Sequence, residues 1–154
     1  MQYPNAKLIV FSKAPTPGQV KTRLTPTLSE NDAARLHSHM LEQTIKMAIE
    51  SKLTSVELHC APNTDHVFFA YLRKKYSIPL QPQIGTGLGE RMFNALSNAL
   101  NIHSSAVLIG TDCPEMQINY LQQAFDHLET ERNDIVIGPV EDGGYVLIGA
   151  TRID

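Results

Sequence analysis

The sequence predicts an α/β protein built as a single-domain, three-layer α/β/α sandwich around a mostly parallel, mixed sheet. Short apolar, β-branched runs alternate with longer segments of helical periodicity, which is the pattern of a sheet with intervening helices. Several runs are apolar on both faces, as strands covered by helices on both sides must be. No repeat or linker interrupts the pattern, and 154 residues suit one core. We therefore treat residues 1–154 as one domain.

Six strands are expected, and their order sets the type of sheet. The apolar runs occupy residues 7–12, 55–60, 78–83, 106–110, 134–138 and 145–149. Only the six residues PVEDGG separate the last two runs, whereas a parallel crossover needs about a dozen or more. The last strand should therefore run antiparallel to the one before it.

Four helices are expected between these strands. The first begins after Ser29, an N-cap with Asp32 three residues later. Its buried stripe is Ala33, Leu36, Met40, Leu41, Thr44, Ile45 and Ala48. The other three helices are expected near residues 64–76, 89–101 and 117–131, each with an apolar face.

The composition excludes several classes of protein. Thirteen basic residues against 16 acidic ones give a net charge of −3, so no overall basic field exists to bind nucleic acid. Two cysteines and six histidines show no zinc-binding spacing. The amino terminus lacks a long apolar segment, and no stretch approaches about 18 apolar residues. We expect a cytoplasmic protein without nucleic-acid or membrane partners.

The segments that follow the strands carry the candidate functional residues. In open α/β sheets the ligand lies outside the carboxyl ends of the strands. Here the first, third, fourth and fifth strands lead into FSKAPTPGQVKTRL, GTGLGER, GTDCPE and GPVEDGGY. These segments offer glycines, cations and carboxylates but no obvious pair of nucleophile and base. That inventory suits phosphate and a divalent metal.

The first of these segments is a basic loop. GQVKT is not a Walker A loop, because Val20 stands where that motif has the glycine before its lysine. Lys13, Lys21 and Arg23, drawn together by the proline-rich turn, are suited to screening a polyphosphate. The alternative is a solvated loop with three unrelated cations. The nucleotide-binding candidates from this loop are Ser12, Lys13, Gly18, Lys21 and Arg23.

GTGLGER after the third strand is a second candidate segment. Gly85, Gly87 and Gly89 alternate and do not follow the first strand, so they are not the dinucleotide-binding fingerprint. They would still let backbone amides approach a nucleotide. Arg91 stands in the first turn of its helix, where a cation is disfavoured unless an anion is nearby. Arg91 is thus a candidate for phosphate or acceptor binding, with the alternative that Glu90 simply satisfies it.

Asp112 is the candidate metal ligand. VLIGTDCP ends an apolar strand and delivers Asp112 to the same edge as the basic loop. A hard carboxylate there suits Mg²⁺, which keeps several waters and bridges phosphate oxygens. The alternative is a capping or Asx-turn role before the helix at 117–131. Cys113, which lacks a dedicated histidine, is interpreted as a small packing residue.

EDGGY places two more carboxylates on this edge. Asp-Gly is a strong hairpin-turn signal, so Asp142 is first a turn residue. A turn at the ligand edge also presents Glu141 to an acceptor hydroxyl or a metal-bound water. The catalytic candidates are therefore Lys21, Arg23, Asp112 and Glu141, and the metal candidates are Asp112 and Asp142.

Four motifs in order carry a resemblance to a known family. FSKAPTPGQVKTRLTPTLS, GTGLGERM, GTDCPEM and GPVEDGGYVLIG, spanning residues 6–149, resemble the radical-SAM/selenodomain-associated glycosyltransferases. KTRLTPTLS followed by an amphipathic helix is also similar to 2-phospholactate guanylyltransferases. The resemblance implies the GT-A, or nucleotide-diphospho-sugar transferase, fold. It places Lys13, Lys21 and Arg23 at the phosphate loop, GTGLGER beside the nucleoside, and Mg²⁺ between Asp112 and the phosphates.

These features together predict a Mg²⁺-dependent, nucleotide-binding transferase. Three cations on the first loop favour nucleotidyl transfer from a nucleoside triphosphate, because they suit a leaving pyrophosphate. The resemblance favours glycosyl transfer from a nucleotide sugar. A third hypothesis is a non-catalytic nucleotide-binding or scaffold domain. The expected partners are a nucleoside triphosphate or nucleotide sugar and a small acceptor.

The resembled family continues past the point where this sequence stops. Its pattern includes another acidic motif, whereas this sequence ends at Asp154, just after YVLIGA. We therefore expect a domain that is incomplete at its C-terminus. The strand at 145–150 would then lie exposed at an edge and pair with its own copy in a homodimer. The competing arrangement places this strand in the middle of the sheet.

Overall fold

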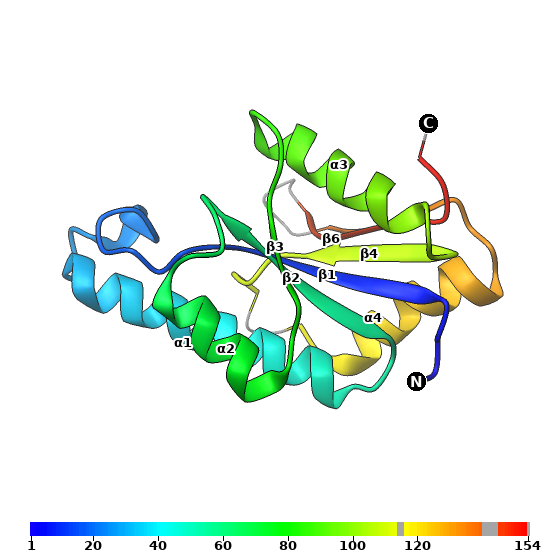
Figure 1. Ribbon diagram of the computed structural model, residues 1–154, viewed down its shortest axis with the longest axis horizontal. Coiled ribbons are helices and arrows are strands. Elements are labelled where there is room, and N and C mark those ends of the chain that lie inside the picture. The colour runs from blue at the N-terminus through cyan, green and yellow to red at the C-terminus, as the bar shows by residue number, and fades with distance from the viewer. Residues whose placement is uncertain (114–115, 140–144, 154) are drawn as a thin grey trace.

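Strands and helices alternate along the chain as the sequence predicts. The computed structural model describes residues 1–113, 116–139 and 145–153. Helices α1 (Glu30–Glu50), α2 (Val67–Tyr76) and α4 (Ile118–Phe125) cover one face of the sheet, and α3 (Leu88–Leu100) covers the other (Figure 1). The three-layer α/β/α architecture is confirmed.

Six strands form one mixed sheet in the order β3-β2-β1-β4-β6-β5. They are β1 (Ala6–Lys13), β2 (Ser55–Ala61), β3 (Leu80–Pro82), β4 (Ser105–Ile109), β5 (Ile135–Pro139) and β6 (Tyr145–Ala150). Strand β6 is antiparallel to both of its neighbours, and the other pairs are parallel. The antiparallel last strand is therefore confirmed. Strand β3 (Leu80–Pro82) is shorter than the expected 78–83.

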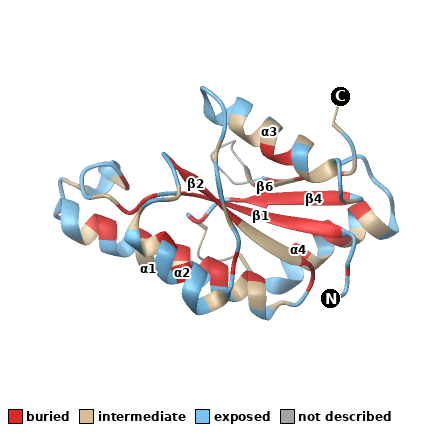
Figure 2. Ribbon diagram, viewed as in Figure 1, coloured by how far each residue is buried: buried red, intermediate tan, exposed pale blue. Residues whose placement is uncertain are grey.

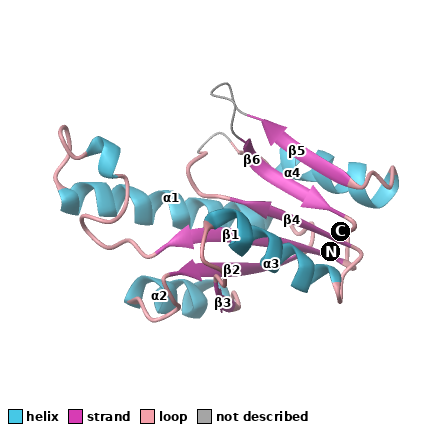
Figure 3. Cartoon of the chain, turned by 90° about the horizontal axis from the view of Figure 1, so that it is seen from above, coloured by secondary structure: helices cyan, strands magenta, loops and turns pink. Residues whose placement is uncertain are grey.

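The position of β6 corrects one expectation. Ile148 pairs with Leu108 of β4 on one side and with Ile137 of β5 on the other. The edges of the sheet are β3 and β5 (Figure 3). The expectation of an exposed edge at 145–150 is wrong, because β5 lies outside β6 and completes its pairing. The reason for expecting a homodimer through this strand is thereby removed.

Helix α1 begins where the sequence predicts. The Ser29 side chain accepts a hydrogen bond from the Asp32 backbone N–H at 3.1 Å. One member of the expected stripe is wrong, since Leu36 is 36% exposed, whereas His37 is only 6% exposed. His37 lies four residues from both Ala33 and Leu41, so it shares their buried face.

The hydrophobic core lies on both faces of the sheet. The larger cluster includes Phe69, Leu72 and Phe125 and fills the space between the sheet and α1, α2 and α4. The smaller one packs Leu96 of α3 against Phe11 and its neighbours. The central strands are buried along their length (Figure 2). In the described part of the chain, no helix is both long and apolar enough to cross a bilayer.

The last predicted helix forms in two segments. Helix α4 is followed directly by η2 (Asp126–Thr130), a π-helical segment, so that together they fill most of the expected 117–131. Phe125 and Leu128 are buried on the same side and keep the chain packed across the junction. The expected apolar face is thus present, with a local change in helical pitch.

Candidate functional site

A cleft lies at the carboxyl ends of β1 and β4. These two strands are parallel neighbours, so the segments that follow them open on the same edge of the sheet. The cleft has a volume of about 760 Å³ and is lined by the loop after β1, the short helix η1 (Thr22–Leu24), and residues after β3 and β4. It collects six of the predicted site residues: Ser12, Lys13, Lys21, Arg23, Arg91 and Asp112.

The charge of this cleft differs from that of the whole chain. Among its described lining residues, four cationic side chains, Lys13, Lys21, Arg23 and Arg91, face a single carboxylate, that of Asp112. The chain as a whole carries a net charge of −3. The three cations of the basic segment line one cleft, and their role in phosphate binding stays a prediction. The local positive excess suits a polyanionic ligand.

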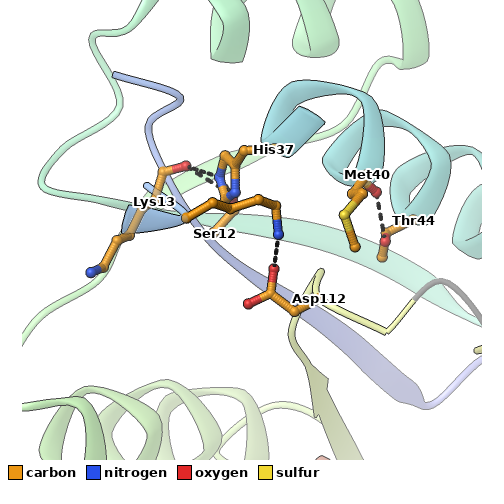
Figure 4. Close-up of polar contacts among 7 residues, drawn as sticks. Ser12, Lys13, His37, Met40, Thr44 and Asp112 are labelled. Atoms are coloured by element: carbon orange, nitrogen blue, oxygen red, sulfur yellow. Dashed lines mark hydrogen bonds and ion pairs between the residues drawn. The ribbon is translucent and has the colours of Figure 1, made fainter. Parts of the chain in front are cut away.

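Lys21 and Asp112 are in direct contact. The Lys21 Nζ lies 2.7 Å from Asp112 Oδ1, which joins the loop after β1 to the loop after β4. Lys21 has a left-handed backbone (φ 51°) just before η1, a conformation that is uncommon for residues other than glycine. Its side chain is 12% exposed, whereas that of Asp112 is 74% exposed. The carboxylate therefore remains open to the cleft (Figure 4).

The surroundings of Asp112 fit a magnesium ion that arrives with a substrate. Gln117 is the N-cap of α4, so the capping alternative for Asp112 is wrong. Among the described residues, no group of three or more His, Cys, Asp and Glu side chains is arranged to hold a metal ion. Mg²⁺ commonly uses one or two carboxylates and completes its shell with water and substrate phosphates. An exposed carboxylate beside several cations fits that mode and does not form a preformed metal cage.

Arg91 is held at the mouth of the cleft by its neighbours. Its Nη1 donates to Gln83 Oε1 at 3.1 Å, and its Nε donates to the Gly87 carbonyl at 3.3 Å. Glu90 instead accepts a hydrogen bond from the Thr86 hydroxyl. The alternative in which Glu90 satisfies Arg91 is therefore wrong, and Arg91 still lines the cleft.

Gln83 links Arg91 to the sheet and was not among the residues predicted from the sequence. Its Nε2 donates to the carbonyls of His59 at 3.0 Å and Ser12 at 3.3 Å, at the ends of β2 and β1. Its Oε1 accepts from Arg91. Gln83 directly follows β3, whereas the expected strand 78–83 included it, so the rule of inspecting the residues after each strand did not select it.

The predicted glycines lie around the cleft and do not line it in the described structure. Gly85 has φ +141°, and a Cβ there would lie 2.9 Å from the Arg91 backbone nitrogen. Gly85 therefore permits the turn that brings in Arg91. Gly87 caps α3 and Gly89 stands in its first turn, both with open space, and Gly18 (φ +83°) shapes the loop after β1. Their contact with a nucleotide stays a prediction.

Two of the predicted acidic residues belong to the segment between β5 and β6. Glu141 and Asp142 lie outside the described residues, so their roles as base and metal ligand stay predictions. Cys113 is half-buried and lines a separate cavity of about 240 Å³ with Met40 and Thr44 of α1. That position agrees with its interpretation as a packing residue.

His37 is a buried residue of the site that was likewise not predicted from the sequence. Its Nε2 lies 2.8 Å from the Lys13 carbonyl and 3.2 Å from Ser12 Oγ (Figure 4). Because a carbonyl only accepts, Nε2 carries the proton and donates it. Burial lowers the pKa of His37, so the neutral form is favoured. His37 thus fixes the end of β1, from which the basic loop departs.

Replacement of His37 should change how stability depends on pH. The pKa of His37 is lowered from 6.5 in the folded chain, so below that pH the unfolded chain binds a proton that the folded chain does not. The free energy of unfolding should fall as the pH drops through this range. In His37→Gln this part of the dependence should disappear. Urea unfolding between about pH 7.5 and 5.5 measures it, and equal slopes for the two proteins would contradict the assignment.

A second, smaller groove beside α3 is less suited to a polyanion. It has a volume of about 250 Å³ and contains Lys7, Glu57 and His59. Glu57 lies 3.2 Å from Lys7 Nζ and 3.1 Å from His59 Nε2. The hydrogen bond from His59 and the charge of Lys7 lower the pKa of Glu57 to about 2. The Glu57 carboxylate is thus already paired with Lys7 and hydrogen-bonded to His59, so we place the candidate site in the larger cleft.

Solved structures define the class of fold. A protein of Desulfovibrio desulfuricans assigned as a nucleotide-diphospho-sugar transferase is 29% identical, with a TM-score of 0.84 over 96% of this chain and 64% of that one. A cytidylyltransferase of Leptospira borgpetersenii is 13% identical, with a TM-score of 0.63 over 97% and 61%. A 4-diphosphocytidyl-2C-methyl-D-erythritol synthase of Anaerococcus prevotii is 10% identical, with a TM-score of 0.63 over 96% and 71%. The chain has the fold of the nucleotide-diphospho-sugar transferases and spans about two thirds of the length of these proteins.

The family follows from the sequence of the larger part of the chain. Residues 44–154 match the model of DUF2064, described as an uncharacterized protein conserved in bacteria, and the chain belongs to this family. The comparison with curated proteins gave no match. The expected nucleotide-diphospho-sugar transferase fold is confirmed, whereas the links to radical-SAM proteins and to 2-phospholactate guanylyltransferases stay predictions.

Proposed function

We propose that this protein is a Mg²⁺-dependent transferase that binds a nucleoside triphosphate in the cleft and transfers its nucleotidyl group to a small acceptor. One observation carries the proposal: four cationic side chains and one exposed carboxylate line a single cleft at the carboxyl ends of β1 and β4. Cations at this edge suit the phosphates of the donor and the pyrophosphate that leaves.

Each group in the cleft has a distinct role in this reaction. The acceptor oxygen forms a bond to the α-phosphorus, the bond to pyrophosphate breaks, and the acceptor loses a proton. Lys13, Lys21 and Arg23 bind the phosphates and stabilise the charge that develops on pyrophosphate. Asp112 holds Mg²⁺, which neutralises phosphate charge when bound. Glu141 is proposed as the acceptor-side base.

The remaining predicted residues complete the proposed donor site. Arg91, fixed by Gln83, is proposed to contact the phosphates or the acceptor, since it lines the same cleft. The segment with Gly85, Gly87 and Gly89 is proposed to lie beside the nucleoside. Asp142 is proposed as a second metal ligand next to Asp112.

The names of similar structures support nucleotidyl transfer. Two of them, the cytidylyltransferase and the 4-diphosphocytidyl-2C-methyl-D-erythritol synthase, are named for cytidylyl chemistry and share the fold. A third is a synthetase whose structure contains CTP. CTP is therefore the first donor to test. The chain covers 96% or more of its own length in these matches, so the cleft lies within the shared fold.

Glycosyl transfer from a nucleotide sugar is the second candidate. It is favoured by the name of the structure that is 29% identical, a nucleotide-diphospho-sugar transferase. The two reactions differ in the leaving group, which is pyrophosphate in the first and a nucleoside diphosphate in the second. A scaffold domain would bind the nucleotide and release neither product.

Product analysis tests the proposal. The protein is incubated with Mg²⁺, each nucleoside triphosphate or nucleotide sugar, and a set of small phosphorylated alcohols, and the products are resolved by ³¹P NMR. We expect pyrophosphate from a triphosphate, in an amount that depends on acceptor and is lost in Asp112→Asn. Nucleoside diphosphate released from a nucleotide sugar would replace the proposal with the second candidate, and binding without either product would establish the scaffold role.

A further inference from the structure

The contact between Lys21 and Asp112 joins two groups to which the proposed function gives different partners. Lys21 is to bind phosphate and Asp112 is to bind Mg²⁺, yet the ammonium lies 2.7 Å from the carboxylate. While this contact persists, the Lys21 ammonium competes with a metal ion for Asp112 Oδ1, and Asp112 competes with a phosphate for Lys21. The cleft therefore holds a cation of its own, the Lys21 ammonium, at the carboxylate that would attract a metal ion.

The contact is specific to Lys21 among the loop cations. The left-handed backbone of Lys21 and the start of η1 direct its side chain, which is 12% exposed, back across the cleft. Lys13 is the last residue of β1, where this loop begins, and its side chain points away from Asp112 (Figure 4). The two lysines thus form a matched pair, in which one contacts the carboxylate and the other does not.

We infer that Lys21 is an internal counter-ion that shields Asp112 from free divalent cations until the phosphates of a nucleotide draw it away. The inference rests on the proposed function for the identity of the two ligands. It makes the nucleotide and its metal bind together and makes the metal alone bind weakly.

Electrostatics explains why the metal ion binds weakly alone and more tightly together with the nucleotide. When a nucleotide enters with Mg²⁺, Lys21 moves to a phosphate and Asp112 moves to the metal, so every charge keeps an opposite partner. When Mg²⁺ enters alone, it must displace the ammonium and leaves a lysine beside a divalent cation, which is repulsive. The coupling is reciprocal, because a nucleotide must raise metal affinity by the factor by which the metal raises nucleotide affinity.

Metal binding in the absence of nucleotide tests the inference. Mn²⁺ serves as the probe, and electron paramagnetic resonance of the free ion measures its affinity for the parent, Lys21→Met and Lys13→Met. We expect Lys21→Met to bind Mn²⁺ about two- to fivefold more tightly, the range expected for removal of a partly exposed ion pair. The affinity of Lys13→Met should change by less than half as much.

Nucleotide binding without metal gives the second half of the test. In EDTA, Lys21→Met should bind CTP more weakly than the parent, as measured by calorimetry. Opposite changes in metal and nucleotide affinity cannot arise from a general loss of structure. If Lys21→Met has a lower melting temperature than the parent, both measurements are repeated with Lys21→Gln, which keeps a polar side chain.

The outcomes separate this inference from the proposed function. Unchanged or weaker Mn²⁺ binding in Lys21→Met, with Mg²⁺-dependent CTP binding by the parent, would overturn the counter-ion role and leave the proposed function intact. A parent that binds no nucleotide under any condition would overturn both.

Discussion

In Asp112→Asn, the Mg²⁺ dependence of nucleotide binding should disappear, and transfer should slow by about 100-fold or more. Asparagine keeps the size of the side chain but removes the charge that would hold the ion. The fold should be unaffected, because Asp112 is 74% exposed and does not cap α4. Affinity for CTP in EDTA should be kept or raised, since the variant also releases Lys21. Calorimetric titration with and without Mg²⁺ measures both effects.

A matched control for this variant is Asp134→Asn. Asp134 is also an exposed carboxylate with a basic partner, 3.3 Å from Arg152. It precedes β5 and so lies at the amino ends of the parallel strands, opposite to the cleft. This control should bind nucleotide and Mg²⁺ as the parent does. A Mg²⁺ effect that survives in Asp112→Asn would exclude Asp112 as the metal ligand.

Arg23→Ala should weaken nucleotide binding by about tenfold, the amount expected for the loss of a hydrogen bond to a charged group. Arg23 lies in η1, lines the cleft, and forms no ion pair in the described part of the chain. Its side chain is exposed, so the melting temperature without ligand should stay close to that of the parent. Calorimetry with CTP and Mg²⁺ gives the affinity.

Arg73→Ala is the control for the loss of one positive charge. Arg73 is an exposed residue near the end of α2, outside the cleft, and removing it changes the net charge of the chain equally. Its affinity for CTP should match that of the parent. Equal affinities of Arg23→Ala and the parent would remove Arg23 from the proposed phosphate site.

Most of the fold could be predicted from local patterns. All six strands and four helices lie where apolar runs and the Ser29 cap indicate, because these features act within one element. The position of β6 between β4 and β5 could not be predicted from local patterns, since strand order depends on pairing between distant segments. The exposure of Leu36 was missed because polar His37 takes the buried position beside it.

In the candidate site, too, some features follow from the sequence pattern and others depend on contacts between distant segments. The shared edge of parallel strands brings Lys13, Lys21, Arg23 and Asp112 to one cleft, and the sequence was sufficient to predict that grouping. The contact of Lys21 with Asp112 depends on a left-handed backbone at a residue that no turn motif marks. Such a contact is a property of loop geometry and not of residue spacing.

Thermal unfolding with and without nucleotide tests the central claim, that the cleft binds a nucleotide polyphosphate together with Mg²⁺. At a concentration about 100 times its dissociation constant, a ligand stabilises the folded state by about 2.7 kcal/mol, which raises the melting temperature of a domain of this size by about 5–10 °C. We predict this shift with CTP or another triphosphate plus Mg²⁺, a smaller one in EDTA, and none with the corresponding nucleoside. A nucleoside as effective as its triphosphate, or no shift with any nucleotide, would contradict the account.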